Sequence, residues 1–86
     1  MAAEAVRTES PCAMMRRAAE SARREIRRRR DEISRLRGEI GHLKGQPDPD
    51  QKAIAALEQR VAVLEEQLER DELSLDTLEQ VISENC

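Results

Sequence analysis

Apolar residues recur at alternating spacings of three and four along two stretches of the chain, residues 12–43 and residues 54–85. This repeat puts one apolar residue at the first position and one at the fourth position of each seven-residue unit, positions that we call a and d. A strand would alternate at every second residue instead. The pattern therefore predicts two long amphipathic helices, each with a narrow apolar seam.

The two seams contain few polar residues. In the first stretch the a positions are Cys12, Ala19, Ile26, Ile33 and Ile40, and the d positions are Met15, Ala22, Arg29, Leu36 and Leu43. In the second stretch the a positions are Ile54, Val61, Leu68, Leu75 and Ile82, and the d positions are Leu57, Leu64, Asp71, Leu78 and Asn85. Because the heptads continue through both stretches, we expect a coiled coil rather than two unrelated surface helices.

A turn is predicted between the two stretches, in the segment Gly45-Gln46-Pro47-Asp48-Pro49-Asp50. Gly45 suits the left-handed conformation just past a helix end, and Pro47 cannot continue that helix. Asp48 is a good N-cap, with Pro49 at the first helical position. Ser10-Pro11 repeats this signal at the start of the first helix. We predict a flexible N-terminal tail over residues 1–9, then a helical hairpin over residues 10–86, with a helix at 10–44, a turn at 45–48 and a helix at 49–85.

Charges beside the seam support this pairing. Folding back at the turn sets Leu36 against Val61 and Ile33 against Leu64, and it sets the e positions of one helix against those of the other. The e positions are basic on the first helix and acidic on the second, and they predict the pairs Arg37–Glu58, Arg30–Glu65, Arg23–Glu72 and Arg16–Glu79. The predicted fold is thus all-α, a two-helix antiparallel coiled-coil hairpin that self-association or a partner completes into a larger bundle.

A parallel dimer of the first helix is the competing arrangement. Its g and e positions would pair between two copies, with Glu25, Glu32 and Glu39 facing Arg30, Arg37 and Lys44. The second helix has Glu at e without a matching row of cations at g, and a short turn keeps the partner within the same chain at high effective concentration. These points favour the hairpin.

Composition and charge further restrict the classes of protein to which this chain could belong. The 86 residues include no Phe, Trp or Tyr, and the net charge is −3. Residues 12–45 carry eleven Lys/Arg and five Asp/Glu, or +6, and residues 46–86 carry three and eleven, or −8. No apolar run is long enough to span a membrane, and Met1 to Glu9 lack the layout of a signal peptide. The default location is cytoplasmic, with leaderless export left open.

Four residues in or near the seam are candidates for special roles. Arg29 and Asp71 fall in adjacent layers and are interpreted as a register lock, with a polar switch or a buried binding site as the alternative. Cys12 and Cys86 lie at the open end of the hairpin. They form a possible disulfide, although free thiols in a reducing compartment and an intermolecular bond remain open. Two cysteines and the remote His42 do not make a zinc site.

Two outer surfaces invite binding hypotheses. The run Arg27-Arg28-Arg29-Arg30 suggests nucleic acid, but acids lie nearby and no aromatic residue interleaves, so a solvated helix face is favoured. Small residues near the turn suggest close approach by another helix, with a locally soft helix end as the alternative. The candidate partner face consists of Gly38, Gly41, Ala55, Ala56, Ala62, Val63 and Leu73.

The turn itself carries a local resemblance. Pro47-Asp48-Pro49 followed by Lys52-Ala53 resembles the coiled-coil tip of DksA-type transcription factors, which enters the secondary channel of RNA polymerase. The match covers residues 47–53, and Gln51 stands where that family has its second tip acid. The resemblance implies a regulator that inserts its acidic tip, Asp48 and Asp50, into a nucleic-acid enzyme.

Nothing in the sequence indicates catalysis. His42 has no neighbouring nucleophile, the carboxylates follow the heptads, and the turn lacks the Lys and Ser/Thr of a phosphate-binding loop. We therefore predict a non-enzymatic protein–protein interaction module, acting as an assembly, adaptor or scaffold subunit, without cofactor or small-molecule substrate. The expected partner is a protein or a second copy of the chain. The tip regulator is the first alternative, and a basic-face nucleic-acid binder is the second.

Overall fold

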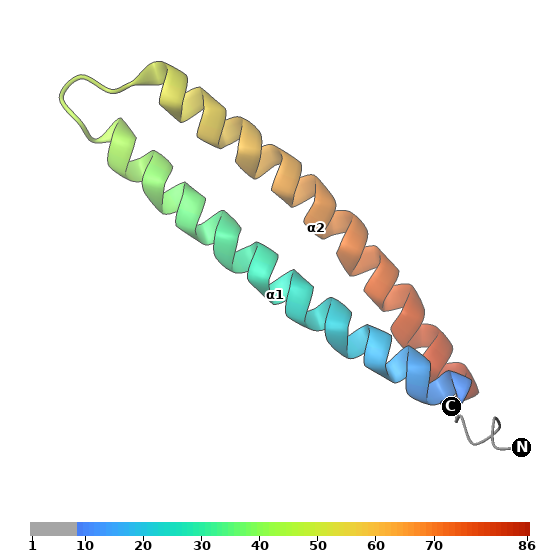
Figure 1. Ribbon diagram of the computed structural model, residues 1–86. Coiled ribbons are helices and arrows are strands. Elements are labelled where there is room, and N and C mark those ends of the chain that lie inside the picture. Colours follow the sequence, from blue (N-terminus) through green and yellow to red (C-terminus); the bar gives the residue numbers. More distant parts are fainter. Residues whose placement is uncertain (1–8) are drawn as a thin grey trace, which may run out of the picture.

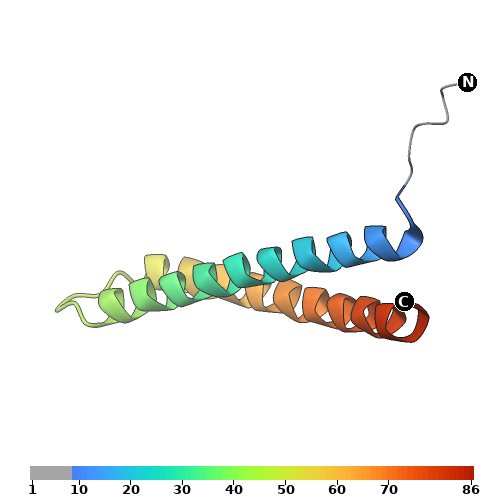
Figure 2. The same cartoon turned by 90° about the horizontal axis from the view of Figure 1, so that it is seen from below.

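The computed structural model describes residues 9–86 and consists there of two long α-helices joined by one turn. Helix α1 spans Pro11–Lys44 and helix α2 spans Gln51–Asn85. The helices run antiparallel and lie side by side, with the turn at one end of the rod (Figure 1, Figure 2). This confirms the predicted all-α helical hairpin. The predicted flexible tail falls outside the described residues, except for Glu9.

The core is a single seam between the helices. Each buried hydrophobic side chain among residues 9–86 occupies a predicted a or d position, and these side chains are Ala19, Ile26, Ile33, Leu36, Ile54, Val61 and Leu64. Ile33, Leu36, Val61 and Leu64 form one cluster, against which Ile40, Leu57 and Leu68 pack. These residues come from the layers predicted to face each other, so the heptads give both the seam and its register.

Helix α1 begins where its sequence predicts. The Ser10 side chain accepts a hydrogen bond from the Ala13 backbone N–H at 3.1 Å, and Pro11 is the first helical residue. The hydroxyl thereby satisfies one of the N–H groups that lack a partner in the first helical turn, and proline needs no partner there.

The end of α1 differs from the expectation. Gly45 has φ −81° and ψ −3°, a right-handed conformation, so the predicted left-handed cap is wrong. The last turn tightens instead: the Gly45 N–H donates to the carbonyls of Gly41 and His42, each at 3.2 Å, and the Gln46 N–H donates to Leu43 at 3.2 Å. These bonds satisfy the last carbonyls without a left-handed residue.

Helix α2 starts two residues later than predicted. Its N-cap is Asp50, whose side chain accepts a hydrogen bond from the Ala53 N–H at 3.1 Å, and its first helical residue is Gln51. Asp48 and Pro49 lie in the turn. In the seam register Ala53 lies level with Lys44, the last residue of α1. A helical turn before Gln51 would project beyond α1 and pack against nothing, and long helices owe most of their stability to packing.

The two turn aspartates provide a test of this boundary. Replacing Asp50 with alanine should lower the free energy of unfolding by about 1 kcal/mol, because the Ala53 N–H loses its acceptor. Replacing Asp48 with alanine is the matched control and should leave stability nearly unchanged. Urea denaturation of the two variants measures both effects, and a larger loss at Asp48 would show that the helix starts at Pro49.

Candidate functional site

Ion pairs follow the edge of the seam that the e positions form. Arg23 donates to Glu79 Oε2 through Nε at 3.0 Å and through Nη2 at 2.8 Å. Nearer the turn lie the pairs Arg30–Glu72, Arg37–Glu65 and Lys44–Glu58, the last with 3.2 Å between Nζ and Oε2. We call this row the ladder. Its members are at least a third exposed, so each pair contributes little stability and serves mainly to choose the partner and orientation.

The partners in the ladder differ from the predicted ones by one heptad. We expected Arg37–Glu58, Arg30–Glu65 and Arg23–Glu72, whereas each arginine pairs with the next glutamate away from the turn. Helical side chains tilt toward the N-terminus of their own helix. In this hairpin the arginines of α1 therefore lean away from the turn and the glutamates of α2 lean toward it. In the ladder, the pairs that meet are those in which the glutamate backbone lies farther from the turn. The tilt does not explain the other edge of the seam, where Arg60 pairs with Glu32.

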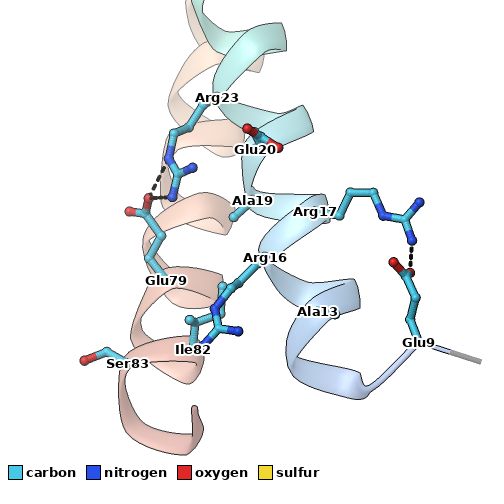
Figure 3. Close-up of a pocket in the computed structure, with 10 residues that line it drawn as sticks. All are labelled: Glu9, Ala13, Arg16, Arg17, Ala19, Glu20, Arg23, Glu79, Ile82 and Ser83. Atoms are coloured by element: carbon cyan, nitrogen blue, oxygen red, sulfur yellow. Dashed lines mark hydrogen bonds and ion pairs between the residues drawn. The ribbon is translucent and has the colours of Figure 1, made fainter.

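The same offset removes the predicted Arg16–Glu79 pair. Glu79 is bound by Arg23, and the next e position along α2 is Cys86. Arg16 lines a hollow together with Ile82 and Ser83 (Figure 3) and takes part in none of the ion pairs within residues 9–86. The ladder thus ends one heptad before the open end of the hairpin.

A charged pair crosses the seam itself. Arg29 Nη1 and Asp71 Oδ2 form an ion pair, and the exposed fractions of the two side chains are 23% and 44%. The structure therefore brings the two predicted seam charges together, and partial exposure keeps their desolvation cost low. Their role as a register lock stays a prediction.

The two cysteines are joined by a disulfide at the open end of the hairpin. Cys12 lies in the first turn of α1 and Cys86 directly follows α2, with their Cα atoms 5.9 Å apart. Of the three states that the sequence leaves open, the structure contains the intramolecular bond. The Cys86 N–H also donates to the Ile82 carbonyl at 2.9 Å, so the last turn of α2 is formed up to the bond.

A hollow of about 790 Å³ lies near the disulfide, along the open end of the seam (Figure 3). Three arginines and three glutamates are among its lining residues, Glu9, Ala13, Arg16, Arg17, Ala19, Glu20, Arg23, Glu79, Ile82 and Ser83. Arg17 pairs with Glu9 and Arg23 with Glu79. Ser83 has no histidine in this lining to act as a base. This hollow was not predicted from the sequence, in which the small residue Ala19 at a seam position is its indication.

The basic run of α1 is largely neutralised by the molecule itself. Arg28 binds Glu25 on its own helix at 2.5 Å, while Arg29 and Arg30 bind Asp71 and Glu72 of α2. Phosphate binding would have to compete with these carboxylates. The arrangement favours a solvated helix face over a nucleic-acid surface.

The residues of the candidate partner face lie on different sides of the hairpin. All of its residues, Gly38, Gly41, Ala55, Ala56, Ala62, Val63 and Leu73, are exposed. The b positions Gly41, Ala55 and Ala62 adjoin the ladder, where Ala62 lines a hollow of about 260 Å³. The c positions Ala56 and Val63 belong to the opposite side of the hairpin. The predicted residues are therefore not brought together on one continuous surface, and Gly41, Ala55 and Ala62 form the small-residue part beside the ladder.

The two acids predicted at the tip, Asp48 and Asp50, have different roles in the structure. Both are exposed, but the Asp50 carboxylate caps α2, whereas Asp48 makes no hydrogen bond within residues 9–86. His42, at the end of α1, lies 3.2 Å from the Gln46 side chain through Nε2. Insertion of the tip into an enzyme stays a prediction.

Comparisons of the chain with protein-family models, curated proteins and solved structures find no match. In the part of the chain that the structure describes, neither helix has the length and apolarity needed to cross a bilayer. The same part contains no group of three His, Cys, Asp or Glu side chains arranged to hold a metal ion.

Proposed function

We propose that the chain is a non-enzymatic protein–protein interaction module, an assembly, adaptor or scaffold subunit in the form of a helical rod. Its seam is occupied by the contacts between α1 and α2. Binding would therefore use the outer faces, and the partner would be another helix.

The glycines in α1 carry this proposal. Glycine inside a helix is about 1 kcal/mol less favourable than alanine. A Cβ atom added at Gly38 or Gly41 would have no neighbour within 4 Å, so contacts inside the hairpin do not require either glycine. Both lie on the outer surface, where the missing side chain allows another backbone to approach closely.

A second copy of the chain is the partner that the charges favour. The chain divides into a cationic half around α1 and an anionic half around α2, so α1 of one copy complements α2 of another. A two-helix seam is also a small core for a chain of this length, and a dimeric four-helix bundle would enlarge it.

The oligomeric state tests this proposal. Light scattering should give a mass of two chains or more, against 9.8 kDa for one chain, and the melting temperature should rise with protein concentration. The double variant Gly38→Leu/Gly41→Leu should return the mass to one chain. Leucine is the better helix former, so this loss would not reflect a weaker helix.

Ser21→Leu provides the matched control, because Ser21 is exposed at a c position on the other side of α1. It should leave the mass unchanged. A mass of one chain at every concentration, together with a melting temperature independent of concentration, would contradict self-association through Gly38 and Gly41.

A further inference from the structure

The core of the hairpin is concentrated toward the turn. We define the turn-proximal half as residues 30–70 and the turn-distal half as residues 9–28 with 72–86. The buried cluster of Ile33, Leu36, Val61 and Leu64 belongs wholly to the turn-proximal half. The same half contains three cross-helix ion pairs, Arg37–Glu65, Lys44–Glu58 and Arg60–Glu32. Most of the buried side chains of the hairpin therefore lie in this half, which we expect to open last.

The turn-distal half is packed more loosely. Ala19 and Ile26 are buried on α1, but no residue of α2 beyond Leu64 is buried. Leu75, Leu78 and Ile82 are only half-buried, and two of them, Leu75 and Leu78, face the small residues Ala22 and Ala19. Hollows of about 790 and 220 Å³ cut into this half, the smaller one lined by Ala22, Leu75 and Leu78 among others. Less apolar surface is thus removed from water here.

A polar layer separates the two halves. The Arg29–Asp71 pair lies across the seam between the buried cluster and the turn-distal layers. Its side chains remain partly hydrated, so separating this layer exposes no apolar side chain of its own, and the nearest buried residue of the turn-distal half is Ile26. Local opening that starts at the chain ends is therefore expected to stop at the Arg29–Asp71 pair.

The disulfide holds the loosely packed half closed. It joins Cys12 to Cys86 at the extreme end of the seam, 74 residues apart in sequence. While the bond is intact, the ends of α1 and α2 cannot separate. With the bond removed, the distal layers depend on the buried side chains of Ala19 and Ile26, on half-buried contacts, and on the exposed pairs Arg23–Glu79 and Arg30–Glu72.

We propose that the Cys12–Cys86 disulfide is a redox switch whose reduction opens the turn-distal half as far as the Arg29–Asp71 pair and leaves the turn-proximal half folded. The reductant is a dithiol. One of its thiolates attacks a sulfur of the disulfide and forms a mixed disulfide, which its second thiol then resolves. The dithiol leaves as a disulfide, having supplied two electrons and two protons, and Cys12 and Cys86 become thiols. Opening exposes the apolar side chains of Leu75, Leu78 and Ile82.

This inference is independent of self-association through Gly38 and Gly41. A hairpin that is monomeric in both redox states could still open at one end, and a dimeric hairpin could remain closed when reduced. Failure of the redox switch and failure of the proposed function are therefore distinguishable.

Amide hydrogen exchange of the full chain, oxidised and after reduction with dithiothreitol, tests the redox switch. Reduction should speed exchange at least about tenfold in residues 13–28 and 72–85. Amides of residues 33–40 and 57–68 should keep their protection. Equal acceleration in both halves would overturn the proposal, because the bond would then stabilise the whole hairpin. Unchanged exchange in both halves would overturn it as well.

Two variants sharpen the test. Cys12→Ser/Cys86→Ser should show the reduced pattern with or without dithiothreitol. Arg29→Leu/Asp71→Leu, which keeps both cysteines, replaces the polar layer with apolar contacts and should slow exchange of the turn-distal half in the reduced protein. If this variant opens as readily as the reduced parent, the boundary assigned to Arg29 and Asp71 is wrong.

Discussion

Replacing Cys12 and Cys86 with serine is expected to lower the free energy of unfolding by about 4 kcal/mol. The disulfide closes a loop between residues separated by 74 positions, and this crosslink removes conformations from the unfolded chain. Equilibrium urea denaturation measures the loss.

The reduced parent protein is the control for this variant. In dithiothreitol it should unfold at the same urea concentration as the double serine variant. Both proteins lack the crosslink, and they differ only at two side chains, which carry sulfur in cysteine and oxygen in serine. A double serine variant as stable as the oxidised parent would show that the bond adds nothing to the fold.

Replacing Leu64 with alanine should lower the free energy of unfolding by about 3 kcal/mol. Leu64 is 3% exposed and belongs to the cluster with Ile33, Leu36 and Val61. Its removal leaves a cavity in the part of the seam that has the most buried surface. Thermal or urea unfolding of the oxidised protein measures the change, so that the disulfide remains constant.

Leu73→Ala is the matched control on the same helix. Leu73 is 62% exposed, so the same substitution should change stability by less than about 0.5 kcal/mol. Comparable losses at Leu64 and Leu73 would indicate that a partner covers Leu73 in solution, or that the seam lies elsewhere on α2. The mass of the protein separates these two explanations.

The seam could be predicted from the sequence because heptad spacing determines which residues share a helix face. Ile33, Leu36, Val61 and Leu64 are buried at their predicted positions. The antiparallel direction followed from the opposite charges at the two sets of e positions and from the short turn. These properties repeat over many residues, so one exception such as Arg29 does not change the result.

The details that depend on a few atoms could not be predicted in this way. Heptad letters place Arg37 on the same edge as Glu58 and Glu65, but the direction in which the side chains tilt selects Glu65. Asp48 and Asp50 are equally good caps by residue type. Asp50 is the cap because α2 begins only where it can pack against α1. Two cysteines allow several redox states, and the spacing of the helix ends is what brings Cys12 to Cys86.

The position of the disulfide also determines how the molecule would respond to mechanical force. If the two ends of the chain were pulled apart, tension entering at Cys12 would pass through the Sγ–Sγ bond directly to Cys86, and the residues between them would bear no load. In the reduced protein the same force would separate the helices one layer at a time from the open end. The oxidised protein would therefore keep its length under a force that separates the two helices of the reduced protein.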